Sequence, residues 1–152
     1  MEKRMSVMGI GHKAGAVIGG YILLTGIPSY VCWPLFRMTK DSYPVLLTIG
    51  LLLAVVGFSL NLAAAFQMLR AYKTDTLATG GLYGVFLHPM YFFQVFVTLP
   101  GLLLLFNSWL VMTAALVGIG TVKLFEKEES RYLEKRYGHA YAVYRQKVRV
   151  RF

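Results

Sequence analysis

Four long apolar segments constrain the fold of this chain more than any other feature of its sequence. They cover residues 14–36, 43–69, 85–106 and 109–125. A helix needs about 20 apolar residues to cross a hydrocarbon core of about 30 Å; the first three segments reach that length and the fourth, at about 17, is shorter. We therefore expect an all-α membrane protein, one domain over residues 1–152, with about four transmembrane helices, the last one short.

The composition agrees with a membrane protein. Apolar residues make up 57% of the chain and charged residues only 15%, a balance too apolar for a soluble domain of this size. The opening Met-Glu-Lys-Arg resembles the charged part of a signal peptide, but the apolar run that follows is about 23 residues long, too long for a cleavable signal. We expect it to remain as the first span.

The formal net charge of +9 is unevenly distributed. Three Lys or Arg residues precede the first apolar segment, two follow it, two follow the second, none separates the third from the fourth, and nine lie from Lys123 onward. Four spans with a cytoplasmic N-terminus leave only the two basic residues of the first loop outside. The positive-inside rule thus predicts that both termini are cytoplasmic. The charge then supports topology and contact with anionic lipid, and we do not expect nucleic-acid binding.

The links between segments predict how the helices meet. Only Asn107 and Ser108 separate the last two segments, so we expect a tight helical hairpin that returns the chain to the cytoplasmic side. There the helical tail, with a break at Gly138, would meet residues 79–91. Asn61 predicts an interhelical hydrogen bond. Small residues let membrane helices approach closely. Five glycines of the first two segments predict such close packing: Gly15, Gly19, Gly20, Gly50 and Gly57.

Residues 79–91 form the entry to the third apolar segment. Gly80, Gly81 and Gly84 permit close ligand approach, and Pro89 suits the first turn of a helix. His88 would then lie at a helix N-terminus near the headgroups, where an ionisable side chain indicates a functional site. An equally good alternative is that this segment only starts the helix and carries an interfacial histidine.

Carboxylates and aromatic rings of the tail add a second group of candidates. Glu129 falls on the helix face that carries Phe125, Tyr132, Leu133 and Arg136, and burying a carboxylate is costly unless it is paired or used. Either Arg136 neutralises it, or it binds hydroxyl or amino groups of a ligand. Aromatic rings can stack on adenine or attract a sulfonium, although core packing or a membrane belt is the alternative; they are Tyr83, Tyr91, Phe92, Phe93, Tyr132, Tyr137, Tyr141 and Tyr144.

Together these motifs resemble a known family. Thr-x-Gly-x-Tyr-x-x-x-x-His-Pro-x-Tyr, an apolar hairpin, a Glu-Glu pair, Tyr-Gly-x-x-Tyr-x-x-Tyr and a basic Val-Arg-Phe ending cover residues 79–152. The pattern is similar to the isoprenylcysteine carboxyl methyltransferases and their relatives, the phospholipid methyltransferases.

The resemblance implies S-adenosylmethionine as cofactor and a lipophilic small molecule or lipid as methyl acceptor, which would enter from the bilayer. It implies a cofactor pocket lined by Tyr83, His88, Pro89 and Tyr91. Glu128 or Glu129 would hold polar groups of the cofactor, and Tyr141, Tyr144 and the terminal arginines would close the pocket. No catalytic side chain is singled out. The histidines, His12, His88 and His139, are too scattered to predict a metal site.

Departures from the family pattern keep other functions open. Leu87 stands where the family usually has Arg before His-Pro, Leu82 stands in place of a proline, and the tail lacks the proline usual near its end. A membrane NADPH-dependent reductase of the sterol reductase type shares the tyrosine-rich ending, and a non-catalytic membrane protein with the same fold is a third possibility. Neither the acceptor nor the oligomeric state follows from the sequence.

Overall fold

The computed structural model describes residues 11–151, with side chains from Lys13 onward, and this part of the chain is helical without a strand. The long helices are α1 (Gly11–Val31), α3 (Tyr43–Lys73) and α7 (Ala114–Tyr137). The shorter elements are α2 (Trp33–Phe36), the 3₁₀ turn η1 (Gly81–Gly84), α4 (Pro89–Phe93), the π-helical turn η2 (Gln94–Thr98), α5 (Leu99–Leu104), α6 (Trp109–Met112) and α8 (His139–Lys147).

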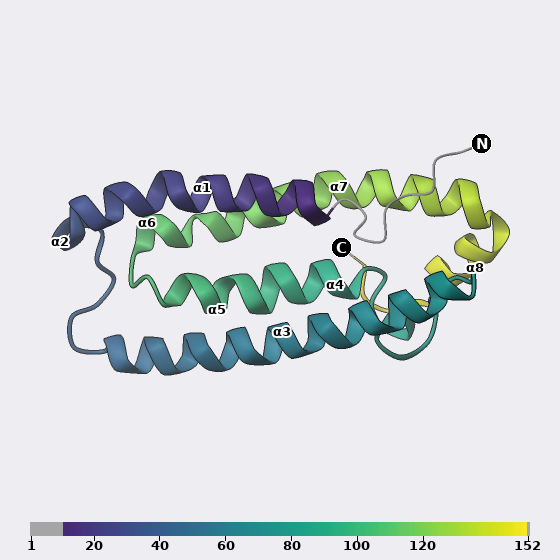
Figure 1. Ribbon diagram of the computed structural model, residues 1–152, viewed down its shortest axis with the longest axis horizontal. Helices are drawn as coiled ribbons and strands as arrows, with labels where there is room; N and C mark the ends of the chain where they lie inside the picture. The colour runs from purple at the N-terminus through teal and green to yellow at the C-terminus, as the bar shows by residue number, and fades with distance from the viewer. Residues whose placement is uncertain (1–10, 152) are drawn as a thin grey trace.

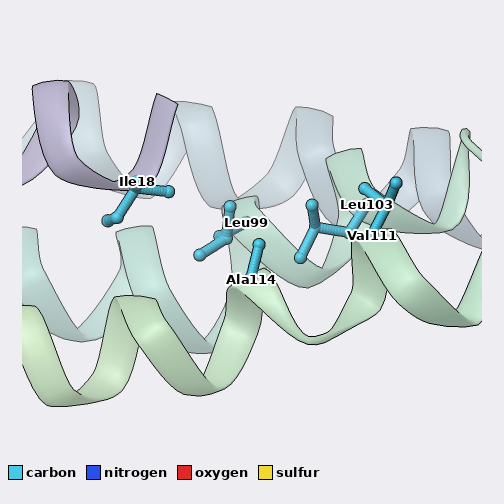
Figure 2. Packing of buried hydrophobic residues seen from close by; sticks show 5 residues of the cluster. All are labelled: Ile18, Leu99, Leu103, Val111 and Ala114. Atoms are coloured by element: carbon cyan, nitrogen blue, oxygen red, sulfur yellow. The ribbon is translucent and has the colours of Figure 1, made fainter. Parts of the chain in front are cut away.

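The helices form two packed pairs (Figure 1). Helix α1 lies along α6 and α7, and α3 lies along α4, η2 and α5. The pairs join through a buried apolar cluster to which α1, α5, α6 and α7 all contribute, and Figure 2 shows its side chains pointing into one space. The cluster consists of Ile18, Leu99, Leu103, Val111 and Ala114.

Three stretches of helix are long and apolar enough to cross a membrane: Lys13–Val31, Tyr43–Lys73 and Trp109–Tyr137. The expectation that the last transmembrane helix is short was wrong. The last helix continues through charged residues to Tyr137. Lys, Glu and Arg have helix propensities similar to those of Leu and Met, so the helix does not end where the apolar residues end. The short apolar helix is instead Pro89–Leu104, which at 1.5 Å per residue measures about 24 Å.

Helix α3 approaches η2 and α5 closely through glycines. A Cβ at Gly57 would lie 2.4 Å from Thr98 Oγ1, and one at Gly50 would lie 2.8 Å from the Gly101 carbonyl oxygen. The Asn61 amide donates to Thr98 Oγ1 at 3.1 Å, which confirms the predicted interhelical bond.

The same prediction fails in α1. A Cβ at Gly15, Gly19 or Gly20 would meet nothing within 4 Å. These glycines face open space, whereas a short residue aids packing only where a partner backbone comes near.

At one end of the bundle, residues 105–108 lead from α5 to α6. Asn107 adopts a left-handed backbone with φ 47°, and its side chain both accepts from the Thr39 N–H at 3.1 Å and donates to the Thr39 carbonyl at 2.8 Å. At the opposite end, Gly138 with φ 51° ends α7, and α8 turns back toward the segment before α4 (Figure 1). That end holds the candidate site.

Candidate functional site

A cavity of about 90 Å³ lies where the last turns of α3, the segment before α4 and the second half of α7 meet. All three elements reach this end of the molecule in Figure 1. The polar side chains of the lining are Tyr72, Thr76, Tyr83, His88, Glu129, Tyr132, Arg136, Tyr137 and Tyr144.

The glycine turn fixes the position of Tyr83. Gly81 has φ 59°, and a Cβ there would lie 2.7 Å from Gln67 Oε1. Gln67 accepts a hydrogen bond from the Leu82 N–H at 3.0 Å, so its side chain holds the turn from α3. The left-handed backbone at position 81 favours glycine.

His88 is held at the N-terminus of α4. It is the N-cap residue, only 7% exposed, and Pro89 occupies the first helical position. Its Nε2 lies 3.1 Å from Ser130 Oγ, which also accepts from the Tyr141 hydroxyl at 3.1 Å. Ser130 thus joins the entry segment, α7 and α8.

The electrostatic state of His88 follows from its burial. Burial and, to a smaller extent, repulsion from Arg145 together lower its pKa from the ordinary value to about 4. The ring is therefore neutral near pH 7. Its 3.7 Å approach to Glu126 Oε1 is accordingly not an ion pair at that pH, although the two groups would form one if the ring gained a proton.

Glu129 is the unusual group of the cavity. It is 9% exposed and has a side-chain hydrogen bond with Tyr91. Its other oxygen, Oε2, is buried and has no hydrogen-bond partner among the described residues. Buried polar atoms are nearly always paired, because an unpaired one loses its hydration without compensation. An unpaired carboxylate oxygen in a cavity wall therefore indicates a place for a ligand's donor groups.

Arg136 does not neutralise Glu129 in this structure. Its guanidinium pairs with Asp75 and donates to the Tyr132 hydroxyl at 2.9 Å, and it lies 5.5 Å from the centre of the Tyr137 ring. These contacts tie the loop after α3 to α7.

The end of the chain closes around the segment before His88. The Leu87 N–H donates to the Val150 carbonyl at 3.0 Å, and the Val150 N–H donates to the Val85 carbonyl at 2.9 Å. The Tyr144 hydroxyl lies 2.8 Å from the Tyr83 carbonyl oxygen, to which it donates. Burial raises the pKa of the Tyr83 and Tyr144 phenols, so both remain protonated donors near neutral pH.

A comparison with known families now bears on this site. A sequence profile described as phospholipid methyltransferase matches residues 45–140, which is more than half of the chain. The matched range includes every lining residue of the cavity except Tyr144 in α8. The chain belongs to the phospholipid methyltransferase family. This is the family of integral membrane methyltransferases that also includes the isoprenylcysteine carboxyl methyltransferases. Searches of curated proteins and of solved structures found no match.

In this phospholipid methyltransferase family member, the structure separates the residues predicted for the site. Tyr83, His88, Glu129 and Tyr144 line the cavity. The other predicted residues do not: Pro89, Tyr91 and Tyr141 are not part of the lining and Glu128 is exposed. Three of these four still support the site, Pro89 by starting α4, Tyr91 through Glu129 and Tyr141 through Ser130.

Other family-derived expectations find no counterpart in the cavity. Arg149 and Arg151 are exposed and are not part of the lining, although the backbone of Val150 between them holds the entry segment. Conversely, Gln67, Asp75 and Ser130 were not predicted, and each acts by a contact with a residue distant in the sequence. A single polar residue without a motif gives no signal of such contacts.

Proposed function

We propose that the protein transfers a methyl group from S-adenosylmethionine to a lipophilic acceptor that reaches the site from the bilayer. The family supports membrane methyltransferase chemistry, and its members generally use this donor. The observation that carries the proposal is the buried, unpaired Oε2 of Glu129 in the wall of the cavity. A ligand with hydrogen-bond donors, such as ribose hydroxyls or an amino group, would satisfy it.

The residues of the cavity fit such a ligand. S-adenosylmethionine supplies a methyl group activated on a positively charged sulfonium. Glu129 would accept from its hydroxyl or amino groups, and the rings of Tyr83, Tyr72 and Tyr137 offer stacking faces and a favourable environment for a cation. A neutral His88 adds no positive charge that would repel it. Such residues bind, align and exclude water, which is the protein's main task in a cofactor-driven displacement.

Binding this ligand requires the cavity to widen. Its volume of about 90 Å³ is below the range of roughly 300–1,000 Å³ for small-molecule sites. One wall is formed by residues 74–79. It is tied to α7 by the partly exposed Arg136–Asp75 pair and by a 3.5 Å contact from the Tyr137 hydroxyl to the Thr76 carbonyl. Exposed ion pairs contribute little stability, so this loop is the part that we expect to move.

The environment of Leu87 bears on the acceptor. Leu87 is buried in an apolar cluster with Tyr141, Tyr144 and Val148 and also lines the cavity, so an uncharged side chain stands where the family usually has arginine. A cation at this position therefore cannot anchor an acidic acceptor in this chain. We propose that the acceptor is lipophilic, as it is for the isoprenylcysteine carboxyl methyltransferases. Residue 87, however, would not hold a carboxylate of that acceptor. The charge distribution supports a site on the cytoplasmic face, with both termini there.

Calorimetric titration of the purified full-length protein with S-adenosylhomocysteine and with NADP tests the donor. We expect binding of the first and not of the second. Glu129→Gln should weaken binding at least tenfold, because an amide can no longer accept at both oxygens, whereas Glu128→Gln on the exposed side of the same turn serves as the matched control. Binding of NADP alone would instead indicate a reductase, and binding of neither would indicate a non-catalytic protein. Incubation with labelled donor and a native lipid extract would then identify the acceptor.

A further inference from the structure

A second hollow lies along a neighbouring face of α7. This basic groove, of about 530 Å³, is lined by Lys123, Glu126, Lys127, Ser130, Arg131, Glu134 and Arg145. It shares no lining residue with the cavity. Two of its lining residues, Glu126 and Ser130, lie next to His88, but its basic side chains take no part in the proposed methyl transfer.

The groove holds an excess of unpaired positive charge. Lys123, Lys127 and Arg131 recur every four residues and so form one stripe of α7, and α8 adds Arg145 from the facing side. Four cations thus face two carboxylates, Glu126 and Glu134. Among the described residues, none of the four cations lies within 4 Å of a carboxylate oxygen as an ion pair. Gathered cations without partners are typical of a site for an anion.

The position of the groove indicates which anion. From Trp109 to Phe125 the last helix is mainly apolar and, at 1.5 Å per residue, spans about 25 Å, close to the thickness of a hydrocarbon core. Lys123 therefore lies at the edge of the core, and Lys127 and Arg131 lie beyond it at the depth of lipid phosphates. Leu124, beside Lys127 on the helix surface, is 70% exposed and extends the groove into an apolar surface suited to an acyl chain.

We propose that the basic groove binds the phosphate headgroup of an anionic phospholipid, with the acyl chains alongside Leu124. Basic residues next to a membrane-spanning helix attract anionic lipid with a strength that corresponds to roughly fivefold in affinity for each Lys or Arg. Two cations of the groove should accordingly account for more than tenfold. The site is independent of the methyl donor, so its test needs no enzymatic readout.

Native mass spectrometry of the full-length protein in detergent tests this site. The protein is mixed with equal amounts of phosphatidylglycerol and phosphatidylcholine of the same chain length. The wild type should retain phosphatidylglycerol in clear preference, and Lys127→Glu/Arg131→Glu should reduce that preference at least tenfold. Lys135→Glu/Lys147→Glu makes the same charge change at exposed residues outside the groove and should keep the preference.

Several outcomes would overturn the proposal. Equal retention of phosphatidylglycerol by the wild type and by the groove variant would do so. Equal loss of the preference in both double variants would also do so, since net charge alone would then explain binding. Loss of the phosphatidylglycerol adduct in a few millimolar inorganic phosphate would show a site for free phosphate rather than lipid. If the charge reversal prevents folding, as thermal unfolding would reveal, Lys127→Gln/Arg131→Gln replaces it with the same expected direction.

Discussion

The Nε2 atom of His88 lies 3.1 Å from the hydroxyl oxygen of Ser130, and through it the ring is joined to α7 and, by Tyr141, to α8. The histidine that opens α4 is therefore not a free interfacial side chain. Its ring is buried and makes polar contacts, and burial makes the charged form of the ring less stable than the neutral form. The protonation of His88 should consequently be linked to the stability of the whole site.

Stability should fall in mildly acidic solution because of His88. Its folded pKa is about 4, and that of the unfolded chain is about 6.5. As the pH falls through this window, the unfolded chain takes up a proton that the folded protein does not, and the folded state loses up to roughly 3 kcal/mol. Thermal unfolding between pH 7 and pH 4.5 should show a steeper loss for the wild type than for His88→Gln.

The exposed His139 provides the control for that measurement. His139→Gln should retain the wild-type slope, and both variants keep Glu126 and Glu129. Identical slopes for the wild type and His88→Gln would mean that the ring is already charged, or accessible to water, in the folded protein.

Gly57→Ala should destabilise the packing of α3 against η2. The new Cβ would lie 2.4 Å from Thr98 Oγ1 and 2.7 Å from the Thr98 backbone nitrogen, and the backbone cannot yield as a flexible side chain would. We expect a loss of about 1–3 kcal/mol, which corresponds to a melting temperature lower by several degrees. Gly20→Ala, with nothing within 4 Å, should melt at or slightly above the wild type, since alanine favours helix. A fall of equal size in both variants would contradict the close approach.

Val150→Pro should loosen the entry segment from a distance. The substitution removes the N–H that donates to the Val85 carbonyl at 2.9 Å, at a cost of about 1–3 kcal/mol if that carbonyl is left unpaired. Because residues 85–87 lead directly to His88, affinity for S-adenosylhomocysteine should fall together with the melting temperature. Val150→Ala keeps both backbone hydrogen bonds and should retain most of the affinity. Unchanged binding in Val150→Pro would show that the end of the chain does not position the site.

Much of this arrangement can be predicted from local sequence signals, and the remainder depends on contacts between distant residues. The helical class follows from apolar runs, and His88 and Pro89 indicate a helix start by themselves. Amphipathic spacing alone also identifies the side of α7 that carries Glu129. In contrast, the lengths of the last two helical stretches were misjudged, because apolar content marks where a helix is lipid-facing and not where its hydrogen bonds end.

The partners of the site lay beyond sequence reasoning for a related reason. Arg136 has a carboxylate two turns away on its own helix, yet it pairs with Asp75, which the turn after α3 brings close. Likewise, Gln67 supports Gly81 and Val150 supports Leu87 only because α3 and the chain end pack beside the entry segment. Such pairs depend on the tertiary arrangement of helices, for which a single sequence without co-varying positions gives no signal.

The side of the membrane on which the site lies can be measured directly. In Figure 1 the loop before α3 and the end of α7 lie at opposite ends of the bundle, and Lys40 and Lys135 are exposed at these two places. In a Cys32→Ser background, which removes the chain's one cysteine, Lys40→Cys and Lys135→Cys each supply one reactive thiol. Intact cells treated with a membrane-impermeant maleimide should label the first and not the second, because positive charge retains the end of α7 in the cytoplasm. Both variants should label after lysis, which controls for reactivity. Labelling of Lys135→Cys alone in intact cells would invert the topology, and equal labelling of both would mean that an even number of the helical stretches between them crosses.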